Sequence, residues 1–392
     1  MNIERIKEQA DEMLPWLVDI RRDFHMHPEL GREEFRTQQK IIEYLEELDI
    51  PYTKIAGTGV VGIIEGAEQG KVVALRGDID ALPIQELSDI PYKSTYDGKM
   101  HACGHDAHTT IVLGAAKILK SMQSELKGTV KLFFQPDEES DGGAEPMIKE
   151  GCLENPKVDY VMGLHMQPAM KTGTARVKYG HLNAASDTLE VVVKGASAHA
   201  AYPEAGVDAI MIAGHVITAL QSLVSRNISP LNSAVVTLGT IRGGTKHNVI
   251  ANEVRMDGTL RTLDPETRQF CYRRLQEIVS NTAKAHGGEG EVIFKPGDTA
   301  LINHDEAVDV AKANAELLLG KENVTLKEQP SLGVEDFAYY LEKTSGAFFH
   351  LGCGNEEKKT TAGAHTGWFN VDEDCLPIGV ALQVMNTLTL LG

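Results

Sequence analysis

The chain has 392 residues, which is more than one ordinary hydrophobic core supports, so we expect two structural units. Hydrophobic residues make up 42% of it and charged residues 24%, near the averages for globular proteins, and this composition excludes disordered and fibrous structure. The formal charge of −18 repels phosphate backbones, so we expect no nucleic acid partner.

The amino-terminal segment and the cysteines indicate where the chain acts. Residues 1–24 show helical periodicity broken by charges, without the apolar core and cleavage site of a secretory signal. No stretch approaches the roughly 18 uncharged apolar residues of a membrane span, so we expect a cytoplasmic protein that does not bind a membrane. In that compartment the five scattered cysteines favour free thiols or a metal ligand over disulfides.

Helices and strands alternate through the first half of the chain. An amphipathic helix is expected up to about Phe24, and a second over residues 37–48. The segments that follow are strands at 60–66, 71–80, 129–135 and 158–165, and helices at 109–122 and 144–151. This alternation predicts an α/β fold with a mixed, mostly parallel sheet flanked by helices.

The segment 184–297 has a different order of elements. Its pattern is β-α-β-β-α-β, which is typical of the split βαβ, or ferredoxin-like, arrangement. After it the earlier alternation resumes and ends with a helix near residues 377–391. We therefore expect a first domain made of residues 1–183 and 298–392, with residues 184–297 inserted as a second domain.

The densest group of metal-binding side chains is MHACGHDAH, residues 100–108, just before an expected helix. A thiolate, imidazoles and a carboxylate are the ligand types that zinc and similar ions bind. The alternative is a polar loop in which Asp106 or Thr109 caps the helix. Three histidines and one cysteine within nine residues favour the metal site. The group contains His101, Cys103, His105, Asp106 and His108.

Acidic and imidazole side chains also follow three of the expected strands. Glu138 and Glu139 come after KLFFQ, His165 ends VDYVMGLH, and Asp78 and Asp80 end KVVALRGDID. Ligands bind beyond the carboxyl ends of the strands in such sheets. One glutamate can then bind a metal ion while its neighbour acts as a general base, and Asp80 can orient a ligand histidine. For the glutamate pair alone, a solvated acidic turn is the alternative.

Eight segments spread over nearly the whole chain form one set: RRDFHMHPELGREEFRT, RGDIDALPI, GKMHACGHDAHT, FFQPDEESDGGA, GLHM, GASAHAAYPEAGVDAI, NVIANEVRMDGTLRT and GVEDFAYY. This set resembles the aminoacylase/carboxypeptidase family of co-catalytic metallopeptidases. Within that family it is similar to the branch of N-acyl-amino-acid, auxin-conjugate and hippurate amidohydrolases. Taken together, the segments are highly specific for this branch.

The resemblance implies a role for each candidate residue. Two divalent ions, zinc or manganese, with cobalt or nickel as further options, would be bound by five side chains. Glu138 would be the general base, and His199 would stabilise the oxyanion, often from across a dimer interface. Asn248 and Arg261 would hold the substrate carboxylate, although an exposed strand residue is the alternative for Arg261. The five expected ligands are Cys103, His105, Glu139, His165 and His365.

The inserted domain of the family is a lid that also forms the dimer, so the resemblance implies a homodimer or homotetramer. Two segments depart from the family pattern, because FQPDEES replaces the more frequent FQPAEEG and GVEDF replaces GSEDF. Neither change removes a metal ligand, but both can alter the rim of the pocket.

The implied function is hydrolysis of the amide bond in N-acyl amino acids by metal-activated water. A carboxypeptidase or dipeptidase of the same family and a non-catalytic metal- or peptide-binding protein are the alternatives. GTGVVG, residues 57–62, fits a dinucleotide-binding fingerprint, but a strand rather than a helix follows it, so we interpret it as a turn. We interpret His25 and His27 as structural, and His215 as a packing or surface residue.

Overall fold

The computed structural model describes residues 2–392. It contains two compact units. The first unit runs up to Gly180 and includes Ile302–Gln329 and Asp336–Gly392, and the second unit consists of His181–Leu301 and Pro330–Glu335. Two short strands, β7 (Gly180–Asn183) and β13 (Leu301–Asn303), lie where the chain passes between the units.

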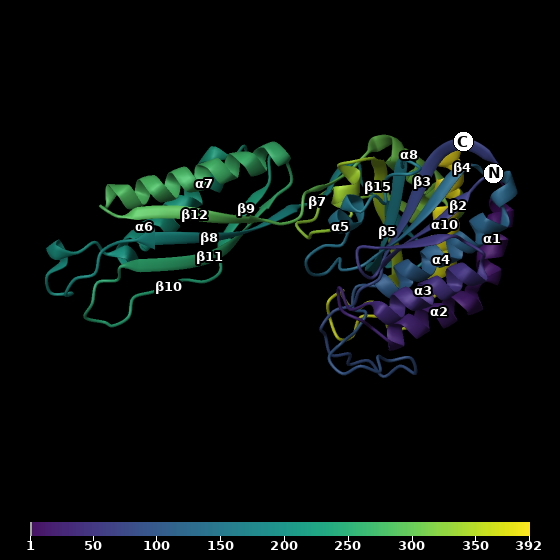
Figure 1. The fold of residues 1–392 in the computed structure, drawn as a ribbon, viewed down its shortest axis with the longest axis horizontal. Helices are drawn as coiled ribbons and strands as arrows, with labels where there is room; N and C mark the ends of the chain where they lie inside the picture. Colours follow the sequence, from purple (N-terminus) through teal and green to yellow (C-terminus); the bar gives the residue numbers. More distant parts are fainter. Residues whose placement is uncertain (1) are drawn as a thin grey trace. The chain divides into compact units, whose positions relative to one another are not determined.

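An eight-stranded sheet forms the centre of the first unit (Figure 1). Its strands are β1 (Tyr52–Ile55), β2 (Gly59–Glu65), β3 (Glu68–Asp78), β4 (Lys127–Gln135), β5 (Tyr160–Lys171), β6 (Ala175–Val177), β14 (Val324–Leu326) and β15 (Ser345–Gly354). They lie in the order β1-β2-β4-β3-β5-β15-β6-β14. The four central strands β4, β3, β5 and β15 run parallel, while β2 is antiparallel to both of its neighbours. The predicted α/β fold class is thereby confirmed.

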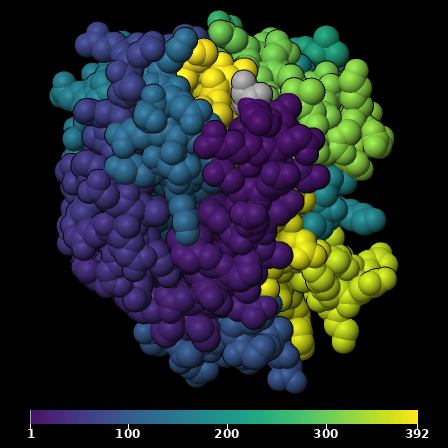
Figure 2. Space-filling model, turned by 90° about the vertical axis from the view of Figure 1, so that its right-hand side faces the viewer, coloured from purple at the N-terminus to yellow at the C-terminus, as the bar shows by residue number. Residues whose placement is uncertain are grey.

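The helices of the first unit pack on this sheet and on one another. They are α1 (Ile3–Glu12), α2 (Leu14–Met26), α3 (Phe35–Glu47), α4 (His105–Ser121), α5 (Ala144–Lys149), α8 (Asp305–Leu319), α9 (Ala338–Leu341) and α10 (Cys375–Leu391). Helices α4 and α10 are apolar around most of their circumference, as expected for helices buried on all sides. They approach closely at Gly114, where a Cβ atom would lie 2.5 Å from Val380. The amino-terminal helices lie beside the carboxyl-terminal residues on the surface (Figure 2).

The second unit is a four-stranded antiparallel sheet, extended by one two-residue strand, with two helices. Its elements are β8 (Ala185–Lys194), α6 (Ala209–Ser222), β9 (Ala234–Leu238), β10 (Arg242–Gly243), β11 (Glu253–Thr262), α7 (Pro265–Ala285) and β12 (Glu289–Pro296). β11 pairs with β8 on one side and with β9 and β10 on the other, and β12 pairs with β8. Helices α6 and α7 lie side by side and pack on this sheet (Figure 1). Their shared core includes Leu189, Val191, Ile212, Val216 and Leu275.

Two helix boundaries differ from the sequence-based expectation. The single opening helix is divided into α1 and α2 at Met13. Pro15 explains the break, since its nitrogen has no hydrogen to donate and its ring crowds the carbonyl four residues earlier. Helix α4 begins at His105 rather than Thr109, directly after Gly104 with a φ of 94°. Glycine adopts this left-handed conformation without strain, so the turn into the helix places His105 in the first helical position.

The segment Ala209–Asn227, which comprises α6 and the π-helical turn after it, is long and apolar enough to cross a membrane by length and composition. The expectation that no stretch approaches this limit was therefore wrong for this segment. In the structure its residues Ile212, Val216 and Leu220 are buried in the core of the second unit.

The sequence GTGVVG forms the connection between β1 and β2 and the start of β2. Gly57 has a φ of 78°, and β2 begins at Gly59 and pairs antiparallel with β1. A dinucleotide-binding loop instead leads from a strand into a helix, whose first N–H groups bind the phosphates. The segment is therefore a hairpin turn.

Candidate metal centre

The five predicted metal ligands lie together in the first unit. They come from the start of α4, from the turn after β4, from within β5 and from the loop before α10. Cys103 Sγ lies 3.4 Å from His165 Nε2, and His365 Nε2 lies 3.1 Å from Glu139 Oε1. The donor atoms of Cys103, His105 and His165 lie within 4.8 Å of one another, as do those of Cys103, Glu139 and His365. Cys103 thus belongs to both groups.

The ring orientations of two histidines direct their second nitrogens at this cluster. His105 Nδ1 lies 3.0 Å from both the backbone oxygen and Oδ1 of Asp80, and His165 Nδ1 lies 2.8 Å from the Met166 carbonyl. These acceptors place the ring proton on Nδ1 of each histidine, which leaves Nε2 with a free electron pair. Such an arrangement is the usual one for imidazoles that bind metal ions.

The environment of His105 Nε2 tests whether a cation fits. This atom is buried and has no nitrogen or oxygen within hydrogen-bond distance. Carboxylate oxygens of Asp78, Glu138 and Glu139 surround it at 3.6 to 3.9 Å. Burial alone disfavours a charged imidazole, but Asp78 and Asp80 outweigh it and raise the pKa of His105. A cation bound at this point would replace that proton, so the donor set fits a divalent metal ion.

Burial also affects two further candidate ligands, the buried Cys103 and the half-buried His165. It raises the pKa of the Cys103 thiol well above its usual value and lowers the pKa of His165 well below it. The neutral imidazole of His165 is already the form that binds metal. The thiol, in contrast, ionises only when a nearby positive charge stabilises the thiolate, and a metal ion supplies that charge.

The two acidic residues after β4 lie at the edge of the cluster, each with 11% of its side chain exposed. Glu138 Oε2 is 3.9 Å from His105 Nε2. Glu139 Oε1 is equally far from that nitrogen and contacts His365. His365 has a left-handed backbone with a φ of 61°, fixed by a 2.8 Å hydrogen bond from its N–H to the Ala102 carbonyl. One carboxylate can therefore bind metal while the other remains accessible to water.

A buried network behind the cluster was missed in the sequence. Asp78 Oδ1 lies 2.6 Å from His108 Nδ1, while Asp78 Oδ2 accepts from Arg76 Nη1 at 2.5 Å. Arg76 also donates to Asp336 Oδ1 at 2.8 Å. His108 Nε2 accepts from the Met166 N–H, so both of its ring nitrogens are engaged and it serves as a support rather than a ligand. The position of Asp78 at the end of β3 was the available signal for this role.

A second buried network anchors the other side of α4. Asp106 Oδ2 accepts from Arg21 Nε at 2.8 Å and lies 2.7 Å from His25 Nδ1. Arg21 Nη2 also donates to the Asn370 side chain at 2.9 Å. The side chains of Arg21, His25 and Asp106 are fully buried. His25 therefore has a structural role, which agrees with its interpretation from the sequence. Asp106, in the first turn of α4, joins this helix to α2 through Arg21 and His25.

We expect the substitution Asp106→Asn to lower the free energy of unfolding at pH 7 by about 3 kcal/mol, because it removes the nearest carboxylate from the buried Arg21 guanidinium and leaves only Glu373, at 3.5 Å. Despite burial, which opposes ionisation, Arg21 and His25 hold the pKa of Asp106 far below its usual value. Its contribution is therefore present at neutral pH and is lost as the pH falls below about 4. Urea unfolding at pH 7 and in acid measures this. An equal loss of unfolding free energy in Asp106→Asn at both pH values would show that the ionised Asp106 carboxylate is not the source of this stability.

Three predicted residues lie in the second unit. His199 lies in the segment between β8 and α6, where its Nδ1 accepts from the Ala201 N–H at 3.1 Å. The neighbouring Ala200 N–H donates to the Asn248 carbonyl at 3.1 Å, so the structure brings the segments of His199 and Asn248 together. Arg261 lies on β11 and donates to the Thr259 hydroxyl and to the Leu260 carbonyl of its own strand.

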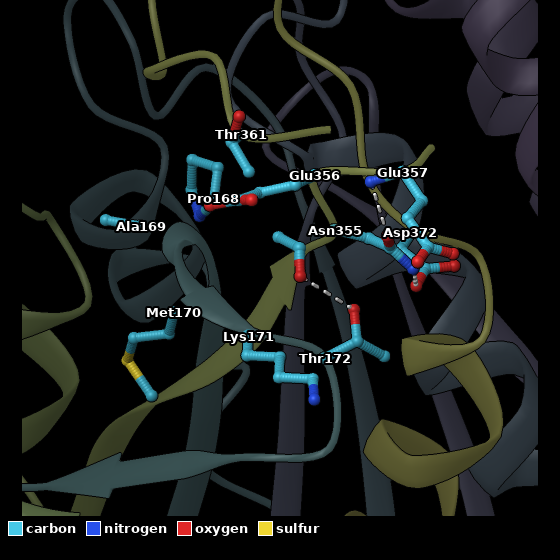
Figure 3. A pocket seen from close by; sticks show the side chains of 11 residues that line it. Pro168, Ala169, Met170, Lys171, Thr172, Asn355, Glu356, Glu357, Thr361 and Asp372 are labelled. Carbon is cyan, nitrogen blue, oxygen red and sulfur yellow. Dashed lines mark hydrogen bonds between the residues drawn. The ribbon is translucent and has the colours of Figure 1, made fainter. Parts of the chain in front are cut away.

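A pocket of about 710 Å³ lies elsewhere in the first unit, at the carboxyl ends of β5 and β15 (Figure 3). None of the predicted site residues lines it. Its Asp372 is bound by Asn355 Nδ2 at 2.8 Å and by Lys358 Nζ at 2.6 Å. The Thr172 hydroxyl donates to the Gly354 carbonyl. The Asp372 and Thr172 side chains of this pocket are thus engaged in hydrogen bonds within the protein.

Comparison with known proteins agrees with this geometry. Residues 74–385 match the model of peptidase family M20/M25/M40. N-acetylcysteine deacetylase of Bacillus subtilis is 40% identical over 92% of this chain and 93% of its own length. Thermostable carboxypeptidase 2 of Saccharolobus solfataricus is 36% identical over 98% of this chain and 97% of its own length.

Solved structures give the same result. A putative aminohydrolase from Staphylococcus aureus matches with a TM-score of 0.95 and 30% identity, covering 100% of both chains. The YXEP protein of Bacillus subtilis, described as a dinuclear metal binding peptidase, matches with a TM-score of 0.86 and 35% identity over 97% of this chain and 99% of its own. The resemblance found in the sequence is confirmed: the chain belongs to peptidase family M20/M25/M40 and is a metal-dependent amidohydrolase.

Proposed function

We propose that the chain hydrolyses the amide bond of N-acyl amino acids with two divalent metal ions. The observation that carries this proposal is the convergence of two donor groups on Cys103, one with His105 and His165 and the other with Glu139 and His365. The deacetylase relatives support the substrate class, and the dinuclear YXEP protein supports the number of ions. Mixed thiolate, imidazole and carboxylate ligands favour zinc or manganese, with cobalt or nickel as further options.

Two divalent ions held by these ligands would lower the pKa of a water molecule and polarise the scissile carbonyl. Glu138 is the proposed general base, since it lies beside a ligand carboxylate and its side chain is partly exposed to water. It accepts the proton of the attacking water and passes it to the leaving nitrogen. Asp80 positions His105 through Nδ1 and holds the Glu139 N–H at 2.9 Å.

We propose that residues 184–297 act as a lid and dimerisation domain on a catalytic domain of residues 1–183 and 298–392. Most of the large apolar side chains that are exposed lie in the second unit, including Ile210, Met211 and Val224 of α6 and the turn after it. Such a surface favours a homodimer or homotetramer. His199 would stabilise the oxyanion in its own or a partner's site, and Asn248 and Arg261 would bind the substrate carboxylate. A cytoplasmic location stays a prediction.

A carboxypeptidase or dipeptidase activity is the second candidate. Two thermostable carboxypeptidases of Saccharolobus solfataricus are 35% and 36% identical to the chain over 98% of its length. Both reactions use the same attack on an amide carbonyl, so the metal cluster alone does not separate them. The difference lies in the group on the acyl side of the bond.

A substrate panel tests the proposal. Metal-loaded protein is assayed with N-acetyl and N-benzoyl amino acids, N-acetyl-diaminopimelate, dipeptides and carboxypeptidase peptides. We expect the highest kcat/KM on an N-acyl amino acid. Preference for the dipeptides or longer peptides would favour the second candidate, and no hydrolysis of any substrate by protein with confirmed metal content would favour a non-catalytic binding protein.

A further inference from the structure

The turn that carries Glu138 is held on both sides by buried carboxylates. The N–H of Asp137, the residue before it, donates to Glu34 Oε1 at 2.9 Å. The N–H of Glu139, the residue after it, donates to Asp80 Oδ2 at 2.9 Å. The expected base therefore lies between two backbone groups that are each fixed by a carboxylate from another part of the chain.

The Glu34 side chain lies in the protein interior. Its exposed fraction is 0%, and its second oxygen accepts from the Thr58 hydroxyl at 2.6 Å. The side chain does not cap the following helix α3, whose first N–H groups are bound instead by Glu29, at 3.0 Å from Arg36 N and 2.8 Å from Thr37 N. The Glu34 carboxyl group therefore connects the β1–β2 turn to the turn after β4.

The turn needs such anchoring because its backbone is strained. Asp137 has a φ of 57°, a left-handed conformation that aspartate adopts more readily than most residues but that is still less favourable than for glycine. Its side chain is bound by Arg32 Nε at 2.8 Å and by the Ser140 hydroxyl. The space around it is full, since a Cβ atom on Gly31 would lie 2.1 Å from Asp137 Oδ1.

We propose that Glu34 is a positioning residue that fixes the Glu138–Glu139 turn for proton transfer. This inference rests on the proposed function, because it assigns the proton transfer to Glu138. Glu34 itself touches neither water nor substrate in this account. It acts through the Asp137 N–H, and its loss would let the turn relax and move the Glu138 carboxylate away from its working position.

The hydrogen bonds of Glu34 determine which substitutions break the contact. Glutamine keeps an oxygen for the Asp137 N–H, and its amide can donate to the Thr58 hydroxyl, which accepts as well as donates. Burial, together with the charge of Asp80, raises the pKa of Glu34 to about 7, so a neutral side chain already occurs there near neutral pH. Leucine fills the space but leaves the Asp137 N–H without an acceptor. Aspartate keeps the charge but is one methylene too short.

The experiment compares Glu34→Gln, Glu34→Asp and Glu34→Leu with a matched control, Glu29→Leu, which removes a carboxylate of the same segment that binds α3 instead of the turn. Two properties are measured on metal-loaded protein: kcat and KM on the best substrate, and amide hydrogen exchange of the peptide covering residues 133–140. The exchange measurement does not depend on activity.

We expect Glu34→Leu to lower kcat by about 100-fold, the scale of a small misplacement of a catalytic group, with KM and metal content little changed. Exchange in residues 133–140 should become faster. Glu34→Gln should resemble the wild type in both measurements, and Glu29→Leu should lower Tm while kcat and exchange in this peptide stay unchanged. If Glu34→Leu does not fold, Glu34→Asp serves in its place, with lower kcat and faster exchange expected.

Wild-type kcat in folded Glu34→Leu, or in Glu34→Asp if the leucine variant does not fold, would overturn the proposal. So would an equal loss of kcat in Glu29→Leu, because the effect would then be general destabilisation. Failure of the proposed function is distinguishable from this. If Glu138→Gln were fully active, the assignment of the base would be lost, while faster exchange in Glu34→Leu would still show that Glu34 holds the turn.

Discussion

The substitution Glu138→Gln is expected to lower kcat by about 10³-fold, the central part of the range that general acid–base catalysis contributes. Glutamine has nearly the same shape but cannot accept the proton of the attacking water. The five proposed ligands are unchanged, and the neighbouring Glu139 keeps its contact with His365. KM and metal content should therefore stay close to those of the wild type. Steady-state kinetics and elemental analysis of the same preparation measure the three quantities.

The adjacent substitution Glu139→Gln is the matched control. It changes the same chemical group one residue further along, but removes a proposed ligand, so metal content should fall together with activity. The two variants thus separate proton transfer from metal binding. Full activity of metal-loaded Glu138→Gln would show that another group accepts the proton.

The substitution Cys103→Ser is expected to weaken metal binding by more than about 100-fold, beyond the effect of changing a residue that only supports a ligand. Cys103 belongs to both donor groups of the cluster, so its loss affects both ions. A serine hydroxyl is a harder and far less acidic ligand than a thiol. Activity at limiting metal should fall in parallel. A calorimetric titration of metal-free protein with zinc or manganese measures the affinity.

Alkylation provides an independent test of Cys103. It is the most exposed of the five cysteines at 8%, whereas the others range from 0% to 3%. Because burial keeps the Cys103 thiol protonated, alkylation of the metal-free protein should be slow, but it should occur at Cys103 before the other four cysteines, and bound metal should protect this thiol. Cys271→Ser, in helix α7 of the second unit, is the control and should bind metal normally. Wild-type metal affinity and turnover in Cys103→Ser would show that Cys103 does not bind metal.

Much of the fold and of the cluster could be predicted from local patterns. The strands β3, β4 and β5 appear as β-rich runs, and the polar residues that follow β3 and β4 mark carboxyl ends that meet at one edge of the sheet, although β5 continues past His165. The split βαβ order also agrees with the elements of the second unit. Cys103, His105 and Glu139 lie in short segments rich in ligand types, so their proximity to one another needs only the parallel order of the strands.

The supporting contacts could not be predicted in the same way, because they join residues far apart in the sequence. Arg76 and Asp336 are separated by 260 positions, and Glu34 and Asp137 by 103. No periodicity indicates which buried carboxylate accepts which backbone N–H. The early start of α4 depends on the left-handed backbone of Gly104, and its composition favoured a start at Thr109 instead. The sequence around Arg261 likewise indicates a strand but not the contacts of the Arg261 side chain.

The most direct test of the account is a metal titration of the metal-free wild-type protein during hydrolysis of an N-acyl amino acid. Zinc or manganese is added in steps, and release of the free amino acid is measured at each step. The proposed two-metal mechanism predicts no hydrolysis without metal and full activity only when two ions are bound per chain. Hydrolysis by metal-free protein, or full activity with a single ion bound, would contradict it.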